Sequence, residues 1–301
     1  MKLQLILALL STTVLSALAS DVSNNNKEGS IDRKEVYGGG APNPLLPPGG
    51  GGNTNIITWN NEHYKFNGQC DLVMMKDDLF ADALGLQVHI RTKMVDYWSY
   101  IKSVAIKIGD DTLEIEGSAD ANDDQEHYWI NYEYQGELGA FAGFSVTRVV
   151  SSTYERDYRI DLNPNAAIVV QVYKEFVRVK FDGDEEVFAN SVGLLGDYTT
   201  GKALGRDGVT VLNDVIEFGD DWQVLPNEEG LFHEFSHPQF PEPCLMPNDP
   251  RGQRRLKLAE STISYAQAEL ACFTVMSDPL SIKDCVNDIL ANQDLDIVGA
   301  Y

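Results

Sequence analysis

The chain has 301 residues, of which 43% are hydrophobic, and it carries 46 acidic side chains against 23 lysines and arginines. The resulting formal net charge of −23 opposes binding to nucleic acid and to anionic membranes, and it favours cations and basic partners. The solubility of an exported protein would explain the same acidity. The apolar content suffices for one large domain and a small one.

The N-terminus predicts export from the cell. Lys2 precedes an apolar stretch over residues 5–10, and Ala17 and Ala19 form the A-x-A pattern of a cleavage site. These are the features of a secretory signal peptide over residues 1–19. The apolar stretch is too short for a bilayer core of about 30 Å. We therefore expect a secreted protein with no membrane span.

Residues 20–53 are predicted to be a disordered linker. Asparagine, glycine and proline dominate this segment, as in the glycine runs at 38–40 and 49–52. Such a composition offers little apolar surface to bury, so a fixed structure is not expected.

From residue 54 the sequence changes to short runs with a period of two, rich in β-branched and aromatic residues. Near residue 178, Val177 and Val179 face one side while Arg178 and Lys180 face the other, which predicts one buried and one wet face. Successive strands without helical patterns between them predict a mainly β protein with an antiparallel β-sandwich over 54–244. The predicted strands are 56–60, 70–76, 86–93, 100–108, 112–116, 128–134, 144–150, 156–162, 166–173 and 176–181.

A turn-rich linker is predicted over residues 245–260, before a small helical tail over 261–301. The linker contains Arg251, Arg254 and Arg255, where a processing protease could cut, although an exposed linker explains the three arginines better.

Two amphipathic patterns predict an α-helical hairpin in this tail. Ser264 and Gln267 suggest a capping box for the first helix. Asp278 can cap the second, and Pro279 suits its first position. The apolar positions, which follow helical spacing, are Ala268, Ala271, Cys272, Val275 and Met276 in the first helix, and Ile282, Cys285, Val286, Ile289 and Leu290 in the second.

The four cysteines are Cys70, Cys244, Cys272 and Cys285. An even number in an exported chain favours disulfides, and four cysteines allow three connectivities. A bridge between Cys272 and Cys285 would staple the helical hairpin and contribute about 3 kcal/mol. The spacing does not match a zinc finger.

Three segments together resemble the von Willebrand factor type D domain. Residues 59–70 read WNNEHYKFNGQC, residues 192–198 read VGLLGDY and residues 218–222 read FGDDW. The corresponding family patterns are FDGxxYxFxGxC, CGLCGNYNG and FGNSW. The resemblance spans about residues 53–244 and implies an extracellular structural module, not an enzyme. The tail is similar to a reduced form of the cysteine-rich C8 module that often follows such domains.

The resemblance also implies a disulfide pairing. Family members have cysteines where this chain has Val192 and Leu195, and the early family cysteine is missing as well. The remaining pair, Cys70 and Cys244, matches the other long bridge of the family. Because Val192 and Leu195 cannot exchange disulfides, covalent multimers by the family route are not expected.

Type D domains commonly hold one calcium ion, and the resemblance places its ligands here. The Asp of FDG corresponds to Asn60, and the loop asparagines correspond to Asp197 and Thr199. Asp207 is the nearest counterpart of a later acidic pair. Calcium needs six to eight hard oxygen ligands, and these four residues supply few of them. The alternative is a glycine-rich turn whose acids face water.

Residues 233–237 match the zinc motif H-E-x-x-H. In metalloproteases a helix places both imidazoles on one face, with the glutamate activating zinc-bound water. Pro238 follows His237 directly and disfavours a helix there. A zinc hydrolase using His233, Glu234 and His237 therefore ranks behind a connector with surface histidines.

The leading hypothesis is a secreted, non-enzymatic protein that acts in extracellular adhesion, matrix or coat assembly through an unidentified protein or matrix partner. Tyr97, Trp98 and Tyr100 are candidate contacts, with the sheet core as the alternative fate of such residues. The second hypothesis is a lipid or small-ligand binding module, which would show a large apolar cavity inside the sandwich.

Overall fold

The computed structural model describes residues 46–95, 97–118, 125–134, 138–152, 155–233, 243–248 and 262–301. The expected signal peptide, most of the predicted linker over 20–53, and Arg251, Arg254 and Arg255 lie outside the described residues.

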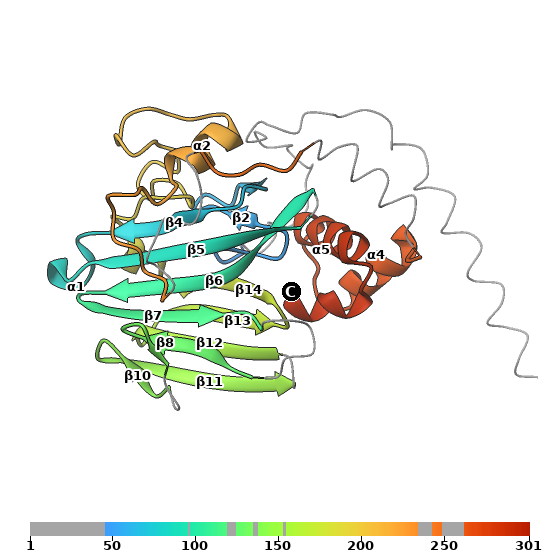
Figure 1. Ribbon diagram of the computed structural model, residues 1–301, viewed down its shortest axis with the longest axis horizontal. Coiled ribbons are helices and arrows are strands. Elements are labelled where there is room, and N and C mark those ends of the chain that lie inside the picture. The colour runs from blue at the N-terminus through green and yellow to red at the C-terminus, as the bar shows by residue number, and fades with distance from the viewer. Residues whose placement is uncertain are drawn as a thin grey trace, which may run out of the picture. The chain divides into compact units, whose positions relative to one another are not determined.

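Two antiparallel sheets form a β-sandwich, as the alternating pattern predicts (Figure 1). The first sheet has the order β10-β11-β12-β13-β14-β1-β2-β3, and the second has the order β4-β5-β6-β7-β8-β9. The strands of the first sheet are β1 (Gly49–Gly51), β2 (Asn55–Ile57), β3 (His63–Lys65), β10 (Ala140–Phe141), β11 (Phe144–Ser152), β12 (Glu155–Asn163), β13 (Ala166–Tyr173) and β14 (Phe176–Gly183). Those of the second are β4 (Asp71–Asp77), β5 (Leu86–Val95), β6 (Trp98–Ile108), β7 (Asp111–Glu116), β8 (His127–Ile130) and β9 (Glu133–Tyr134).

The described helical segments are short in the sandwich and longer in the tail. They are α1 (Phe80–Ala83), η1 (Glu185–Phe188), α2 (Val215–Asp221), α4 (Tyr265–Phe273), α5 (Pro279–Asn292) and η2 (Leu295–Ala300).

Period-two burial builds the core between the sheets. Along β12, the side chains of Tyr158 and Ile160 are buried, whereas their neighbours Asp157 and Arg159 are partly exposed. Large side chains such as Met74 and Phe181 fill the space between the sheets. Burial of these apolar surfaces is the main stabilising contribution to the fold.

The end of the predicted linker proved to be part of the sheet. Gly49–Gly51 forms β1, which pairs with β14 on one side and β2 on the other. Its glycines permit a close approach, because a Cβ at Gly51 would lie 2.4 Å from Cγ of Arg178. The prediction of disorder up to residue 53 was therefore wrong for residues 49–51, where backbone pairing replaces the missing side-chain pattern.

Strand boundaries differ from the expectation at one turn. The predicted strand 128–134 is divided into β8 and β9 by Asn131 and Tyr132, whose φ angles are 50° and 68°. Positive φ at two central residues is the geometry of a tight hairpin turn. The short elements β3, β10 and α2 carry too few residues for a periodic pattern and were not predicted.

The tail forms the predicted helical hairpin with the predicted caps. Ser264 and Gln267 make a capping box at the start of α4. Asp278 accepts a hydrogen bond from the backbone N–H of Ser281 at the start of α5, with Pro279 in its first turn. These contacts satisfy backbone N–H groups that a helix start leaves unpaired.

An aromatic cluster joins the sandwich to the tail. Tyr97, Trp98 and Tyr100 are 6%, 5% and 1% exposed and pack, together with Phe176, in one cluster with apolar residues of α4 and α5 such as Ile289. These aromatic residues are therefore core, and their candidacy as surface contacts was wrong. The tail itself removes them from water.

A buried carboxylate adds polar contacts to this junction. Asp288 of α5 is 1% exposed, and its Oδ2 accepts hydrogen bonds from the backbone N–H of Asn53 and from the hydroxyl of Tyr301. The ammonium of Lys65 lies 3.8 Å from Oδ1. Burial raises the pKa of Asp288, and Lys65 partly opposes that shift. The hydrogen bonds reduce the cost of burying this carboxyl group.

Candidate functional site

The first two signature segments lie against each other in the structure. The hydroxyl of Tyr64 donates to the carbonyl of Leu194 at 2.6 Å, and the backbone N–H of Trp59 donates to the carbonyl of Leu195 at 3.1 Å. The ring of Trp59 packs on that of Tyr198, with centroids 5.4 Å apart. Residues separated by more than 100 positions thus form one packed loop cluster.

The third signature segment closes the same cluster. It forms most of α2 and ends at Trp222, whose carbonyl accepts from the backbone N–H of Val73 at 2.8 Å. The indole N–H of Trp222 donates to the carbonyl of Leu204 at 2.9 Å. The rings of Phe218 and Tyr64 lie 5.9 Å apart. The three segments therefore serve packing and backbone pairing.

Both predicted disulfides are present. Cys70 is bonded to Cys244, and Cys272 is bonded to Cys285. All four cysteines of the chain are used in these intrachain bridges. At the positions of the family cysteines, Val192 is partly buried against the core and Leu195 is 1% exposed. Apolar packing occupies the place of the family's second bridge.

The predicted calcium ligand Asn60 lies beside the loop that contains Asp197. Its Oδ1 accepts a hydrogen bond from the hydroxyl of Thr58, and its Nδ2 donates to the carbonyl of Gly201 at 2.8 Å. The hydroxyl of Thr58 accepts from the N–H of Glu62, and of its two acceptors Oδ1 of Asn60 is nearer than the carbonyl of Glu62 at 3.2 Å. Because Gly201 offers only an acceptor there, the amide N–H₂ must face it.

The other predicted ligands are engaged within their own turns. Oδ1 of Asp197 accepts from the N–H and hydroxyl of Thr200, and the hydroxyl of Thr199 donates to the carbonyl of Ala189. The carboxylate of Asp207 accepts from residues 209 and 210, and the hydrogen bonds from Thr210 lower its pKa. At the carbonyl of Gly201, Asn60 presents an N–H donor, whereas a calcium ion would need an oxygen ligand in that place. This arrangement does not fit calcium, so we expect these residues of the unaltered protein not to bind it.

Replacing Asn60 with aspartate should create a calcium response. The new carboxylate would face the carbonyl of Gly201 without a proton between them. We expect Asn60→Asp to reduce the free energy of unfolding by about 1 kcal/mol, which lowers the melting temperature by about 2–4 °C in EGTA. Calcium should restore this loss, because a cation can bridge two oxygens.

Thermal melting in calcium and in EGTA measures this effect. Asn60→Ala is the matched control, since it removes the same hydrogen bond but adds no ligand. Its lower melting temperature should not respond to calcium, and the unaltered protein should melt equally in both buffers. A clear rise in the melting temperature of the unaltered protein in calcium would contradict the geometric argument.

His233, the first residue of the H-E-x-x-H match, is bound to the second sheet. Its backbone N–H and its Nδ1 contact Oε2 of Glu114 in β7 at 2.6 and 3.0 Å. Its ring stacks on Trp129 of β8 with centroids 3.8 Å apart. Glu114 is 2% exposed, and burial raises its pKa. Glu234 and His237 lie outside the described residues.

Glu114, Glu116 and His233 bring potential metal-ligating atoms within 4.8 Å of one another. These groups already have partners. The ammonium of Lys102 lies 3.2 Å from Glu116, and Glu114 accepts both contacts from His233. The cluster therefore acts as a polar anchor that holds the segment around residue 233 on the sheet. Sequence reasoning missed Glu114, since alternation alone marks it as an ordinary strand position.

The helical tail presents apolar side chains to solvent. Tyr265, Leu270 and Phe273 of α4 are 57%, 70% and 57% exposed, and Val275 beyond the helix is also exposed. The opposite side of α4 buries Ala268 and Cys272. Among its nine residues, Glu269 alone carries a charge. A helix that is apolar on both sides exposes surface suited to a partner.

Comparison with known families gives one match. The model of the von Willebrand factor type D domain matches residues 50–203, which include the first two signature segments and most of both sheets. The match ends before α2, Cys244 and the helical tail. No curated protein matches the chain significantly. Among the described helices, none has the length and apolar character needed to cross a bilayer.

Proposed function

Because the chain belongs to the von Willebrand factor type D family, we propose that it is a secreted, non-enzymatic protein that acts in extracellular adhesion, matrix or coat assembly. Domains of this family are structural and interaction modules, and disulfide-bonded domains are typical of extracellular proteins. All four cysteines are bonded within the chain. Association is therefore proposed to be non-covalent.

The observation that carries this proposal is the exposed apolar surface of α4, defined by Tyr265, Leu270 and Phe273. Leu270 and Phe273 are three positions apart, so they lie next to each other on the helix. Aromatic side chains such as Tyr265 and Phe273 are enriched in protein interfaces, where a few large residues supply most of the binding energy. The tail, docked on a rigid sandwich, would present this surface to a matrix protein.

Cell fractionation tests the proposal. Cells that express the full chain should release it through the secretory route and retain it in the detergent-insoluble extracellular fraction. We expect the variant Leu270→Ser with Phe273→Ser to move largely into the medium. Each serine removes an apolar contact of about 1.5–3 kcal/mol, so retention should fall by at least about tenfold.

The control variant is Val149→Ser with Val150→Ser on β11, where both side chains are about half exposed. It removes similar apolar surface from the sandwich and should leave retention unchanged. Unaltered protein that stays inside the cell, or that is wholly free in the medium, would overturn the proposal. Equal retention of the Leu270/Phe273 variant would show that α4 is not the contact.

The lipid-binding alternative expects a large apolar cavity within the sandwich. In the described part of the core, Met74, Tyr158 and Phe181 fill the space between the sheets. No specific observation favours lipid carriage inside the sandwich.

A further inference from the structure

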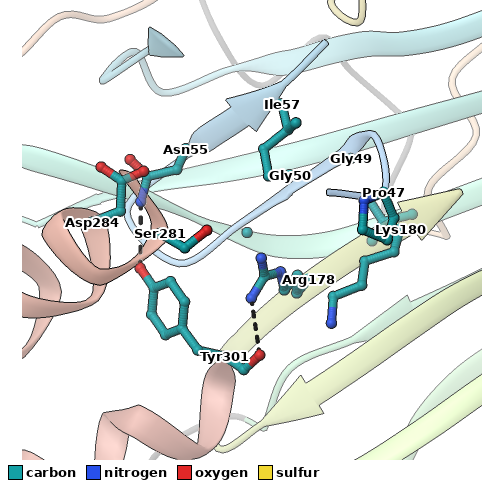
Figure 2. A pocket seen from close by; sticks show the side chains of 12 residues that line it. Pro47, Gly49, Gly50, Asn55, Ile57, Arg178, Lys180, Ser281, Asp284 and Tyr301 are labelled. Carbon is teal, nitrogen blue, oxygen red and sulfur yellow. Dashed lines mark hydrogen bonds between the residues drawn. The ribbon is translucent and has the colours of Figure 1, made fainter. Parts of the chain in front are cut away.

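Two basic side chains lie beneath the helical tail. Arg178 and Lys180 are two residues apart on β14, so both leave the same face of the sheet. The alternating pattern predicts that this face meets water. Instead, both side chains are half-buried between β1 and the tail, and they point into a shared pocket (Figure 2). Ser281 and Asp284 of α5, together with Tyr301, line its other side.

This pocket continues into a cavity of about 240 Å³. Leu46, Ile57, Val275 and Met276 form the apolar part of its wall, while Arg178 and Lys180 supply the positive charge. Ligand sites for drug-sized molecules usually measure about 300–1,000 Å³. The cavity therefore suits a smaller molecule that has both a charged and an apolar part.

In the described residues, no aspartate or glutamate carboxylate lies within ion-pair distance of either basic side chain. Arg178 donates to the backbone oxygen of Tyr301 at 3.4 Å and lies over its ring, whereas Lys180 has no hydrogen-bond or ion-pair partner among the described residues. Several other bases pair closely with acids, as Arg91 does with Asp71 and Lys174 with Asp294.

The lack of an aspartate or glutamate partner for Arg178 and Lys180 is unexpected in a chain with 46 acidic residues. Burial, together with the neighbouring charge of Arg178, lowers the pKa of Lys180 to about 8. Burial also lowers the pKa of Arg178. Two partly desolvated cations side by side are costly without a counter-charge, and a bound anion would supply one.

We propose that this cavity binds a small organic anion, whose carboxylate, sulfate or phosphate group contacts Arg178 and Lys180. Guanidinium groups bind such oxyanions through paired hydrogen bonds, and lysine adds a point charge. The apolar part of the ligand lies against Ile57, Val275 and Met276.

The acids nearby pair with other groups, although Asp284 and Asp288 attract the charge of Arg178 from a longer distance. Asp278 also lines the cavity, but its Oδ2 accepts the N–H of Ser281 at the start of α5. Asp284 faces His63, with 3.9 Å between its Oδ2 and the imidazole Nδ1. Asp157 and Asp182 act on Lys180 only through longer-range attraction. Tyr301 is a further titratable neighbour, and burial keeps its pKa raised.

Calorimetric titration of the full chain tests the proposal with five probes. Hexanoate, hexyl sulfate and hexyl phosphate combine an anionic group with a short apolar chain, whereas hexanol and inorganic phosphate each provide one part. We expect at least one hexyl anion to bind about tenfold or more tighter than hexanol and inorganic phosphate, as a charged hydrogen bond or a buried chain contributes about 1.5–3 kcal/mol. The relative affinities of the three anions identify the preferred head group.

Substitution of Lys180 provides the critical comparison. Lys180→Gln should weaken binding about tenfold or more, while Lys180→Arg should retain it. Lys76→Gln is the control, because it removes one lysine charge from β4 of the other sheet. The stability of Lys180→Gln should not fall, since the lost ammonium has no described partner.

Binding should also depend on pH in a characteristic way. Affinity of the unaltered protein should fall as the pH rises through about 8 and Lys180 loses its proton. Lys180→Arg should show no such fall, because arginine remains charged. Absence of binding by all three hexyl anions, equal binding by inorganic phosphate, or full binding by Lys180→Gln would overturn the proposal.

Discussion

Removing the bridge between Cys70 and Cys244 should reduce the free energy of unfolding by about 5 kcal/mol, as expected for a loop closed over 174 residues. The bridge joins the start of β4 to the exit of the sandwich, where Gln69 and Leu245 pair through their backbones. Without it, the unfolded chain gains the freedom to separate these ends. Whole domains are stable by only about 5–15 kcal/mol, so such a loss approaches the total.

The double substitution Cys70→Ala with Cys244→Ala is the suitable variant, because a single substitution would leave a reactive thiol. Urea unfolding of the oxidised protein measures the change. The control is Cys272→Ala with Cys285→Ala, which opens a loop of 13 residues and should cost about 3 kcal/mol. A smaller loss for the long bridge than for the short one would contradict the loop-entropy argument.

Replacing Gly193 with alanine should cost about 3–5 kcal/mol, from backbone strain and a steric clash together. Gly193 has φ of 137°, and a Cβ there would lie 2.6 Å from the carbonyl oxygen of Met74. The neighbouring backbone pairs closely with β4, since Lys76 and Val192 exchange hydrogen bonds at 2.8 and 2.9 Å. The clash therefore involves backbone, which cannot move aside without breaking this pairing.

Gly208→Ala is the matched control for the Gly193 variant. Gly208 also has a positive φ, of 69°, but no atom lies within 4 Å of the Cβ position. It should cost only about 1 kcal/mol, the usual penalty for alanine in a left-handed conformation. Urea unfolding of both variants separates conformational strain from the clash. Equal losses would mean that the contact with Met74 contributes nothing.

The regular part of the fold is predictable because short-range rules govern it. The alternation around Val177 and Val179 predicts β14, and Ser264 with Gln267 predicts the start of α4. Both disulfides were also predicted, the short one from helical spacing and the long one from family resemblance. In each case the residues that carry the signal are the residues that make the contact.

Long-range packing accounts for what the sequence did not reveal. Gly49–Gly51 has no side chains to alternate, so its place between β14 and β2 depends on partners far along the chain. Trp98 packs in one cluster with residues of the tail, and Lys180 lies in a cavity that the tail helps to line. The role of Asn60 likewise depends on the carbonyl of Gly201, to which its amide donates. Such contacts leave no local pattern.

The two disulfides close separate covalent rings, and no disulfide joins one ring to the other. One ring closes between Cys70 and Cys244, and the other closes between Cys272 and Cys285. A single peptide-bond cleavage between the rings would thus yield two fragments, even in oxidising surroundings. Non-covalent contacts, such as those of Asp288 and Lys174, would then hold the C-terminal fragment in place. Proteolysis could therefore release the fragment that carries α4 and unroof Arg178 and Lys180 in one step.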